Sequence, residues 1–348
     1  MNDSIIRDII KDFNSKDLDY SVIVVANTHN IVEETKKWNY KHTTLDEFFS
    51  RKEFAEIASA IFNVFGFVRV FYSEVEFIKN MIENNQNKAN TVVYNLARDG
   101  IHEGKKSLIP SFCDLFGIKY TGSNAFVISL LRNKYVYSNF LHQLGIPIPN
   151  TFLYDVFEGF ITSFPADGRK IVKYINESAS IGLTNNNIIE FENNASCLKK
   201  LQNITNQMQT EKVIVQDYIE GDECEVLVIK YKQKYYALDP IMIDIHGSSI
   251  ITSNISNAYD YDFCLLSEKY NNQLCSDICK CAEKAATLLN IDTYARFDFR
   301  IDSNNNYYLF DIAGTPYTIK HSSISYIFKK YGFRYEDIYK TFVQIAMS

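Results

Sequence analysis

Two strand patterns separated by a run of asparagines constrain the fold of this chain more than any other feature of its sequence. They lie in residues 294–317, which read YARFDFRIDSNNNYYLFDIAGTPY. The polar break at 303–306 predicts a hairpin turn, because asparagine tolerates the positive φ that tight hairpins need. If the middle two residues of this break form the loop, Asp298 lies directly opposite Asp311. Aspartate is depleted in strands, so an aligned pair calls for a physical reason.

Alternation along the two strands predicts one apolar face and one charged face. The residues expected to face the core are Phe297, Phe299, Ile301, Tyr308, Phe310 and Ile312. Those expected on the opposite face are Arg296, Asp298, Arg300, Leu309, Asp311 and Ala313. Adjacent carboxylates repel one another unless a cation lies between them, and such hard oxygen ligands suit Mg²⁺. From the hairpin alone, a metal site and an exposed sheet face with arginine–aspartate pairs both stay open.

The whole chain, at 348 residues, is long enough for two or three packed units with a substantial core. Its formal net charge of −6 argues against a general affinity for nucleic acid or for an anionic membrane, since both need clustered Lys and Arg. No apolar run reaches the roughly 18–20 residues of a membrane-spanning helix. Residues 1–17 lack the apolar region of a secretory signal peptide, so we expect a cytoplasmic protein.

The seven cysteines are expected to be free, reduced thiols, because disulfides are rare in the reducing cytoplasm. Cys275, Cys279 and Cys281 are close enough together in a predicted helix to suggest a soft-metal site. However, Cys281 points away from the other two, and no histidine is near enough in the sequence to complete a ligand set.

Strand patterns at 20–27, 67–73 and 91–97 alternate with helical patterns in the first third of the chain. Strands that alternate with helices predict a parallel sheet, and hence an α/β first domain that ends near residue 122. From about residue 150 onward the strand patterns alternate with a period of two, which predicts antiparallel sheet and an α+β second half. These later patterns are KIVKYI, VIVQDYI, CEVLVIKYK and KYYALDPIMI, followed by the hairpin.

Phosphate groups of nucleotides are usually cradled by a glycine-rich loop, but neither G-x-x-x-x-G-K-[ST] nor G-x-G-x-x-G occurs here. What remains is a distributed set: Lys134 in a helix, Lys173 in a strand, the small residues 178–180, and the acidic hairpin. Lysines and loop amides can bind phosphate oxygens without such a loop, and an acidic pair opposite them can hold Mg²⁺. Taken singly, a strand lysine is more often a solvated edge residue than a ligand.

Five motifs in a fixed order carry a resemblance to a known family. They are FGIKYTGSN, LLRNKYVYSNFLHQLGIPIP, KIVKYINESASIG, VIVQDYIEGDECEVLVI, and ARFDFRID followed by YLFDIAGTPYTIKHSS. In these motifs, from about residue 91 to the end, the chain resembles the ATP-grasp enzymes and, within them, a divergent branch of the D-alanine–D-alanine ligase-like group. The resemblance implies a Rossmann-like pre-ATP-grasp domain at 1–122, a central ATP-grasp subdomain at 123–212, and a C-terminal antiparallel-sheet catalytic domain at 213–348.

The resemblance also implies ATP as the cofactor. Lys134 and Lys173 would contact its phosphates, and Glu223 would accept hydrogen bonds from the ribose hydroxyls. The interdomain strand expected along the adenine consists of Gln216, Asp217, Tyr218 and Ile219. The loop expected to close on the phosphates and the acyl group runs from Glu177 through Ser178 to Ser180.

The aligned aspartates acquire their physical reason from the same resemblance, which implies that Asp298 and Asp311 bind one or two Mg²⁺ ions. Arg296 would stabilise negative charge on an acyl phosphate and on a tetrahedral intermediate, a task suited to a fixed guanidinium. Together with Ser180 of the closing loop, Arg296 forms the expected catalytic set. The residues expected around the incoming amine are Tyr317, His321, Ser322 and Ser323.

The implied activity is that of an ATP-dependent carboxylate–amine ligase. A substrate carboxylate attacks the γ-phosphate to give an acyl phosphate and ADP, and an amine then displaces phosphate to form an amide. The protein would mainly position the reactants and stabilise charge. The expected partners are a small-molecule carboxylate and a small-molecule amine, with no nucleic acid and no membrane; related ligases commonly form homodimers, and the sequence leaves the oligomeric state open.

Three positions in these motifs depart from the pattern of the family. Ala313 stands where the family usually has a metal-ligating asparagine, which puts a second Mg²⁺ in doubt. Tyr317 stands in place of a glycine, so its ring would intrude near the amine substrate. Cys264 stands in place of a phosphate-contacting lysine, which Lys269 would replace only if the loop is reshaped.

The first strand is followed by NTHNIVEETK, which lacks the glycine-rich turn and the glutamate pattern that hold the first D-alanine in the family. His29, Glu33 and Glu34 lie there, and we expect them to form an ordinary polar helix start. Because the departures affect substrate recognition more than ATP, we expect an amino-acid-like substrate pair other than two D-alanines. The alternatives are a D-alanine–D-alanine ligase with altered motifs and an ATP-binding protein that has lost catalysis.

Overall fold

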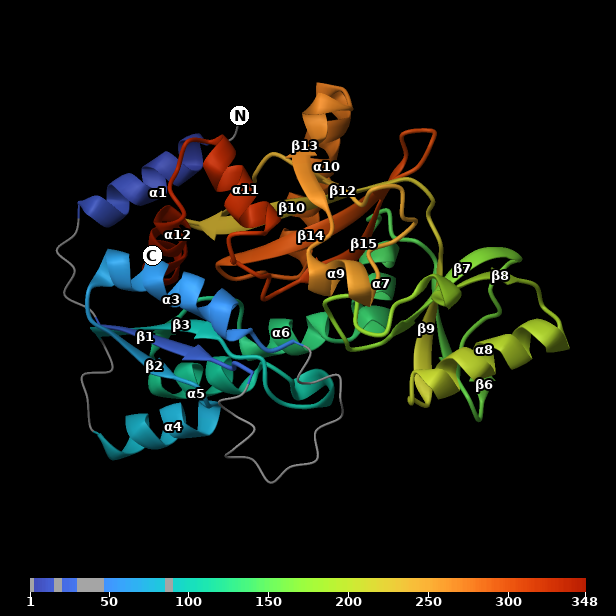
Figure 1. Cartoon of the computed structure of the whole chain (residues 1–348), viewed down its shortest axis with the longest axis horizontal. Coiled ribbons are helices and arrows are strands. Elements are labelled where there is room, and N and C mark those ends of the chain that lie inside the picture. The colour runs from blue at the N-terminus through green and yellow to red at the C-terminus, as the bar shows by residue number, and fades with distance from the viewer. Residues whose placement is uncertain (1–2, 16–20, 30–46, 85–89) are drawn as a thin grey trace.

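Three β-sheets form the framework of this computed structural model, which describes residues 3–15, 21–29, 47–84 and 90–348 (Figure 1). The first sheet is parallel, and the second and third are antiparallel. Figure 1 shows the first sheet at one end of the molecule and the second sheet at the other. The parallel and antiparallel halves predicted from the sequence are therefore confirmed.

The first sheet has the strand order β2-β1-β3-β4. Its strands are β1 (Ser21–Ala26), β2 (Val68–Phe71), β3 (Thr91–Leu96) and β4 (Lys119–Tyr120). The surrounding helices are α1 (Ser4–Asn14), α3 (Arg51–Phe65), α4 (Glu74–Glu83), η2 (His102–Gly104) and α5 (Leu108–Phe116). β1 and β3 are buried along almost their whole length, as expected for apolar parallel strands that are covered on both faces.

The second sheet has the order β6-β5-β9-β7-β8 and is covered on one face by α8 (Ala195–Gln207). Its strands are β5 (Thr151–Asp155), β6 (Gly159–Phe160), β7 (Gly168–Tyr174), β8 (Ile188–Phe191) and β9 (Lys212–Asp217). Leu201 of α8 packs with Val172 of β7 and Val215 of β9 in the core of this sheet. β7 and β9 lie next to each other, so strand pairing brings Lys173 of β7 close to the expected adenine segment at the end of β9.

The third sheet has the order β13-β12-β10-β14-β15, with β11 also paired to β10. Its strands are β10 (Asp222–Tyr231), β11 (Lys234–Ala237), β12 (Ile241–Asp244), β13 (Asp262–Leu265), β14 (Tyr294–Ile301) and β15 (Tyr307–Ala313). The remaining elements are α6 (Ala125–Leu131), α7 (Lys134–Gln143), η3 (Asn185–Asn187), α9 (Ser253–Ala258), η4 (Leu266–Glu268), α10 (Asn272–Leu288), α11 (Ser323–Lys330) and α12 (Glu336–Met347). α10 buries one face of this sheet, which leaves part of the other face available to a cavity.

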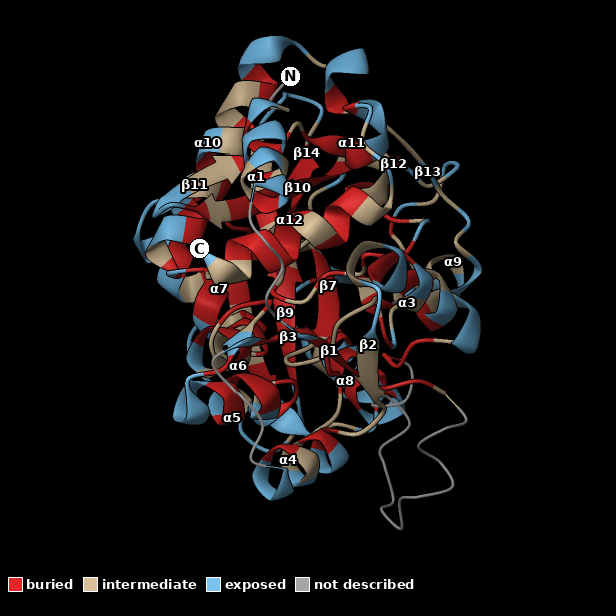
Figure 2. Ribbon diagram, turned by 90° about the vertical axis from the view of Figure 1, so that its left-hand side faces the viewer, coloured by how far each residue is buried: buried red, intermediate tan, exposed pale blue. Residues whose placement is uncertain are grey.

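The C-terminal helix α12 joins the first and third sheets in one apolar core. Tyr339 of α12 packs against Tyr94 of β3 with ring centroids 5.4 Å apart, and Phe342 stacks on Tyr294 of β14 at 3.8 Å. α12 also lies against α1, so the two end helices of the described chain are neighbours (Figure 1). Figure 2 shows that buried residues are concentrated in the strands and on the inner faces of the helices.

The hairpin of β14 and β15 pairs Asp298 with Asp311, as predicted. The connection differs from the prediction: Asp302 N–H donates to the Asn306 carbonyl at 2.9 Å, so the loop has three residues, 303–305. A β-bulge at Phe310 then restores the expected register at the aspartates, since Phe299 pairs with Leu309. Two departures from the simple hairpin therefore cancel at the position that matters for the site.

Three residues of β15 between the loop and Asp311 face the opposite way from the prediction. Leu309 is fully buried in the core, whereas Phe310 lines the cavity on the opposite face. Tyr308 pairs with Arg300, so it shares the face of the charged residues. The predictions for Tyr308, Leu309 and Phe310 are wrong, because the three-residue loop shifts the pairing by one residue and the shift lasts until the bulge at Phe310.

All seven cysteines are free thiols, as predicted. No helix among the described residues is long and apolar enough to cross a membrane. The division into domains at 1–122, 123–212 and 213–348 stays a prediction; β1 to β4, β5 to β9, and β10 to β15 build the three separate sheets.

Candidate active site

A cavity of about 370 Å³ lies where α6, α7, the segment after β7 and the free face of the third sheet meet. A smaller cavity of about 60 Å³ adjoins it and shares Lys173, Ser180 and Glu223 as lining residues. Most of the predicted site residues line one cavity or both. The adenine segment from Gln216 to Ile219 lines the smaller one, and the expected phosphate, metal and amine residues line the larger one.

Three carboxylates form a row across neighbouring strands of the third sheet. Glu225 of β10 pairs with Asp298 of β14, which pairs in turn with Asp311 of β15. All three side chains line the larger cavity, and Asp298 is buried, so this is not an exposed sheet face. The sequence prediction missed Glu225. The same signal could have found Glu225, because Glu223 and Glu225 alternate with apolar residues in the stretch ECEVLVI at 223–229.

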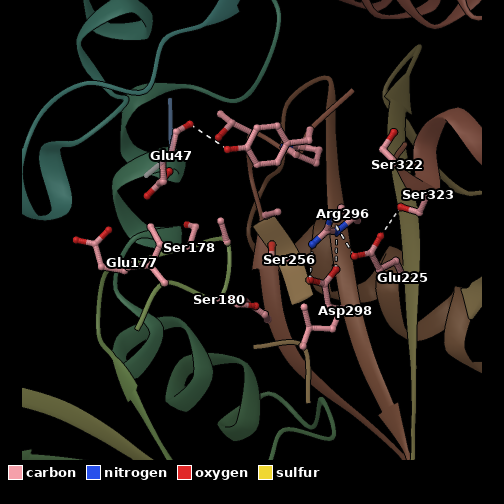
Figure 3. Close-up of a pocket in the computed structure, with 18 of the residues that line it drawn as sticks. Glu47, Glu177, Ser178, Ser180, Glu225, Ser256, Arg296, Asp298, Ser322 and Ser323 are labelled. Atoms are coloured by element: carbon pink, nitrogen blue, oxygen red, sulfur yellow. Dashed lines mark hydrogen bonds and ion pairs between the residues drawn. The ribbon is translucent and has the colours of Figure 1, made fainter. Parts of the chain in front are cut away.

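Arg296 lies between two of these carboxylates (Figure 3). Its Nε and Nη2 donate to the two oxygens of Asp298, both at 2.8 Å, and its Nη1 is 3.0 Å from Oε1 of Glu225. The hydroxyl of Ser323 donates to the other oxygen of Glu225. Bidentate pairing of this kind fixes a guanidinium in both position and plane.

Burial raises the pKa of Glu225 to about 7, against the opposing effect of Arg296. Burial also raises the pKa of Asp298, again against the effect of Arg296, and the nearby Asp311 adds to the rise. Each carboxylate therefore occupies a site where negative charge is costly unless a cation is close.

Asp311 is held by cations on its other side. Nζ of Lys134, the first residue of α7, is 2.5 Å from Oδ1 of Asp311, and the hydroxyl of Tyr137 donates to the same oxygen at 2.8 Å. Burial would raise the pKa of Asp311, but Lys134, Lys173 and the tyrosine outweigh it and hold the pKa at about 2. This carboxylate is ionised at every physiological pH.

Lys173 of β7 lies close to this group. Its Nζ donates to Oε1 of Gln216 at 3.0 Å and lies 4.9 Å from the centre of the Phe310 ring. Burial lowers the pKa of Lys173 to about 8, in spite of the attraction of Asp311. Lys134 and Lys173 together place two ammonium groups beside the aligned aspartates, an arrangement suited to phosphate oxygens.

The side chains of the expected adenine segment are largely committed to protein partners. Asp217 forms an ion pair with Lys170 at 2.7 Å, and the Tyr218 ring lies under the guanidinium of Arg169 at 4.7 Å. A nucleotide base in the smaller cavity would therefore meet mainly the backbone here. Glu223 is buried and accepts from Arg300 at 3.0 Å, and burial raises its pKa.

The loop after β7 is tied to its surroundings in this structure. Arg132 donates to the hydroxyl of Ser178 at 2.9 Å and lies 3.4 Å from the carboxylate of Glu177. The hydroxyl of Ser253 donates to the carbonyl of Ser180 at 2.7 Å. Ser180 itself has a φ of 54° and lines both cavities. The loop thus closes one side of the larger cavity.

All four residues expected around the amine line the larger cavity. The Ser322 hydroxyl caps α11, because it accepts a hydrogen bond from Ser325 N–H and donates one to the Ile319 carbonyl. Tyr317 donates from its hydroxyl to the Glu47 carbonyl at 3.0 Å, so its ring does occupy the space that a glycine would leave.

Ala313 lines the cavity, and its methyl side chain has no atom that could bind a metal. Lys269 is half exposed and pairs with Asp222 at 2.5 Å, so the structure does not support it as a replacement for the lysine missing at Cys264. His29 lines the larger cavity, whereas Glu33 and Glu34 lie outside the described residues.

The aligned aspartates fit a Mg²⁺ ion that takes its other ligands from phosphate oxygens and water, the usual way in which nucleotide sites hold this ion. No cluster of three or more His, Cys, Asp or Glu residues in the described part of the chain could hold a metal by itself. The donor set therefore favours a metal that arrives with a nucleotide.

A parallel sheet followed by two antiparallel sheets, with two lysines and an acidic pair around the cavity between them, defines an ATP-grasp enzyme. The family model described as "D-ala D-ala ligase C-terminus" matches residues 163–344, just over half of the chain. The chain thus belongs to the D-alanine–D-alanine ligase family of ATP-grasp enzymes, and it is an ATP-dependent ligase that forms C–N bonds. This family uses ATP and Mg²⁺.

Individual relatives agree with this assignment. The chain is 24% identical over 250 residues to the D-alanine–D-alanine ligase of Wolbachia pipientis subsp. Culex pipiens (strain wPip), covering 68% of this chain and 70% of that protein. The structure is also similar to D-alanine–D-alanine ligase from Bacillus anthracis, both alone and complexed with ATP. Each of these comparisons has a TM-score of 0.65 at 14% identity and covers 94% of this chain and 97% of the other. The predicted ATP-grasp fold is confirmed.

Proposed function

We propose that this ligase activates a carboxylate as an acyl phosphate and joins it to an amine, and that its substrates are amino-acid-like molecules other than two D-alanines. The observation that supports this best is that Lys134 and Lys173 lie beside Asp298 and Asp311 in one cavity. A bound phosphate group could therefore contact both the lysines and a metal ion that the carboxylates hold.

In this proposal the nucleotide base occupies the smaller cavity, along residues 216–219. Its phosphates then reach the larger cavity past Lys173, which lines both. Asp298 and Asp311 hold Mg²⁺, which neutralises charge on the phosphate oxygens when it is bound. The number of ions is one in this proposal, because Ala313 offers no further ligand.

The ion pairs of the ligand-free site are replaced when substrates bind. Lys134 now neutralises Asp311, and Arg296 neutralises Asp298. Phosphate oxygens would then pair with Lys134 and Arg296, and Asp298 and Asp311 would become available to hold a divalent ion. Arg296 keeps its contact with Glu225, which holds the guanidinium in place during the exchange.

Two bond changes complete the reaction. A carboxylate oxygen of the donor attacks the γ-phosphorus, and ADP leaves. The amine nitrogen then attacks the acyl carbon, the carbon–oxygen bond to phosphate breaks, and inorganic phosphate and a proton are released with the amide. Arg296 is placed to stabilise negative charge in both steps, and the closed loop at 177–180 excludes water from the acyl phosphate.

Departure from two D-alanines rests on the shape of the cavity. The ring of Tyr317 fills space beside Arg98. The part of the larger cavity around His321 is lined by the rings of Tyr259, Tyr261 and Phe263. The cytoplasmic location stays a prediction, and the oligomeric state stays open.

Release of phosphate from ATP and Mg²⁺ tests the proposal, measured across a panel of D- and L-amino acids, dipeptides and simple carboxylic acids, with mass spectrometry of the products. We expect release that requires one acid and one amine, and a product at their summed mass less water. A product that forms only from two D-alanines would contradict the substrate proposal. Silence across the panel in a protein that binds ATP would favour a non-catalytic role.

Asp298→Asn is the matching variant. Because the amide removes one of the two charges proposed to hold Mg²⁺, we expect turnover to fall by about a hundredfold or more while nucleotide binding without metal persists. Asp8→Asn, at an exposed position of α1, serves as the control and should turn over ATP at the wild-type rate. Equal rates for Asp298→Asn and wild type would remove Asp298 from the metal site.

A further inference from the structure

The wall of the larger cavity opposite Arg296 carries a group of buried cations, which we call the cationic cluster. It consists of Arg98, Lys105, Lys106 and Arg132, together with the carboxylates of Glu47 and Glu177. Figure 3 shows Glu47 and Glu177 on one side of the cavity and Arg296, Asp298 and Glu225 on the other. The catalytic steps above use none of the four basic residues.

Glu47 is the shared partner of three of these cations. Its carboxylate is 2.8 Å from Nζ of Lys105 and 3.1 Å from Nη1 of Arg132, and it also pairs with Lys106. Burial would raise the pKa of Glu47, but the three cations together hold it well below its usual value. Glu177 is farther away, at 3.5 Å from Lys105 and 3.4 Å from Arg132. Among the residues that the structure describes, two carboxylates thus face four basic side chains.

Arg98 forms no ion pair with a carboxylate of the described residues. Its guanidinium lies 4.1 Å from the ring centre of Tyr317 and 4.6 Å from that of Phe49, and it donates to the Thr315 carbonyl at 3.1 Å. The residue is only 3% exposed, and its Nε has no hydrogen-bond partner. Aromatic faces stabilise a guanidinium, but they do not neutralise it.

Excess buried positive charge is costly unless an anion compensates it. The protein lowers part of this cost at Lys106, since burial lowers the pKa of that lysine well below its usual value. Arginine has no such escape, because its guanidinium stays protonated. Arg98, Lys106 and Arg132 all line the cavity, so an anion in the cavity would supply the missing charge.

Tyr317 links this cluster to a departure in the sequence. The resemblance to the ligase family predicted a glycine there, and a glycine would give neither the ring under Arg98 nor the hydroxyl that binds the Glu47 carbonyl. One substitution therefore both narrows the cavity and helps to build the platform of Arg98.

We propose that the carboxylate substrate of this ligase carries a second anionic group, a carboxylate or a phosphate, which binds Arg98, Lys106 and Arg132. This inference rests on the proposed function, and it names the class of the acyl donor. The donor is assigned to this wall because Ser322 and Ser323, two of the four residues expected around the amine, lie on the opposite side (Figure 3). Tyr317, another of the four, lies against Arg98 and is assigned to the donor side instead. The far anion docks on the cationic cluster, and the reacting carboxylate points toward Arg296 and the phosphates.

Matched pairs of acids test the proposal in the phosphate-release assay with the full-length protein, ATP, Mg²⁺ and the amine panel. Glutamate is compared with glutamine, aspartate with asparagine, and O-phosphoserine with serine, each as D and L forms. We expect the anionic member of at least one pair to have a kcat/KM about tenfold or more above its neutral partner, since charge-assisted hydrogen bonds are replaced by none. The dicarboxylate and phosphate arms identify which anion the site takes.

Arg98→Gln should lower the ratio of kcat/KM between the anionic and neutral acids by about tenfold, mainly through KM, because the contact is made before and during the reaction. Arg98→Lys keeps the charge and should retain most of that ratio, which separates charge recognition from a folding defect. Arg334→Gln, whose side chain is 73% exposed outside the cavity, is the control and should leave the ratio unchanged.

Binding of glutarate and of O-phosphoserine, measured by calorimetry in the presence of ADP, tests the cluster independently of turnover. If neutral acids are joined as well as anionic ones and neither probe binds, the inference fails while the ligase proposal stands. If no acid supports turnover but a probe binds to wild type and not to Arg98→Gln, the ligase proposal fails while the anion site stands. No probe binding in any form of the protein would overturn the inference.

Discussion

At the scale of single residues, the arginine and the lysine beside the aligned aspartates are already paired with carboxylates before any substrate is present. Arg296 is shared by Asp298 and Glu225, and Lys134 is paired with Asp311. These contacts keep buried charges neutralised in the ligand-free protein. They also mean that binding of ATP and a metal exchanges partners, which costs less than creating charge in an empty cavity.

The pH dependence of ATP binding follows from Lys173. Burial lowers its pKa from 10.5 to about 8, so the ammonium is present below pH 8 and is lost as the pH rises through that value. We therefore expect ATP affinity to be constant from about pH 6.5 to 7 and to fall as the pH rises above 8. A titration of the Kd for ATP by calorimetry measures this.

The control for that titration is Lys173→Gln, which should bind ATP more weakly and without the decline above pH 8. Lys199→Gln, at an exposed position of α8, should behave as wild type. A decline that persists unchanged in Lys173→Gln would assign the titration to another group.

At the scale of elements, the site depends on how β9, β10, β14 and β15 are joined. The turn between β9 and β10 passes so close to the end of β14 that a Cβ on Gly221 would lie 1.9 Å from the Ile301 carbonyl. Its φ of +145° is also one that residues with side chains rarely adopt. This turn fixes the expected adenine segment relative to Glu223.

Gly221→Ala should lower the free energy of unfolding by about 2 kcal/mol or more, because the backbone must move to admit the methyl group. It should also weaken ATP binding, since the turn links the adenine segment to Glu223. Urea unfolding and the ATP Kd are the measurements. Gly104→Ala is the matched control, since a Cβ there meets nothing within 4 Å, and wild-type behaviour of Gly221→Ala would contradict the close approach.

The hairpin of β14 and β15 shows how far local pattern can predict a site. The alignment of Asp298 with Asp311 followed from alternation and an asparagine turn, and it is confirmed. The three-residue loop and the bulge at Phe310 were not predictable from alternation, because each shifts the pairing by one residue and together they leave it unchanged. The positions between the loop and the bulge were accordingly assigned to the wrong faces.

At the scale of the whole molecule, one core joins the first sheet, α12 and the third sheet. Phe342 of α12 stacks on Tyr294, the first residue of the strand that carries Arg296 and Asp298. Stability of the N-terminal sheet and geometry of the site are therefore coupled through the C-terminal helix.

Phe342→Ala should lower the free energy of unfolding by about 3–5 kcal/mol, since it removes a fully buried ring and leaves a cavity. Phe157→Ala removes a ring that is 78% exposed and should change stability by no more than about 0.5 kcal/mol. Urea unfolding followed by circular dichroism measures both, and similar midpoints for the two variants would argue against a shared core.

The sequence by itself determined the parallel first part and the antiparallel second part of the chain, the alignment of the two aspartates and the family. Periodicity, turn chemistry and motif order are local or sequential properties, so they can be read along the chain without knowing which elements meet. The same kind of reading could have added Glu225, whose strand alternates in the same way.

Only the tertiary structure decided what surrounds the substrates. The cationic cluster takes Glu47, Arg98, Lys106 and Arg132 from segments that are far apart in the sequence, and no local pattern marks them as neighbours. The excess positive charge of the cluster is costly because folding buries those side chains beside one cavity, where water can no longer solvate them. The cationic cluster therefore depends on contacts between distant segments, whereas the residues expected to bind ATP could be named from motifs along the chain.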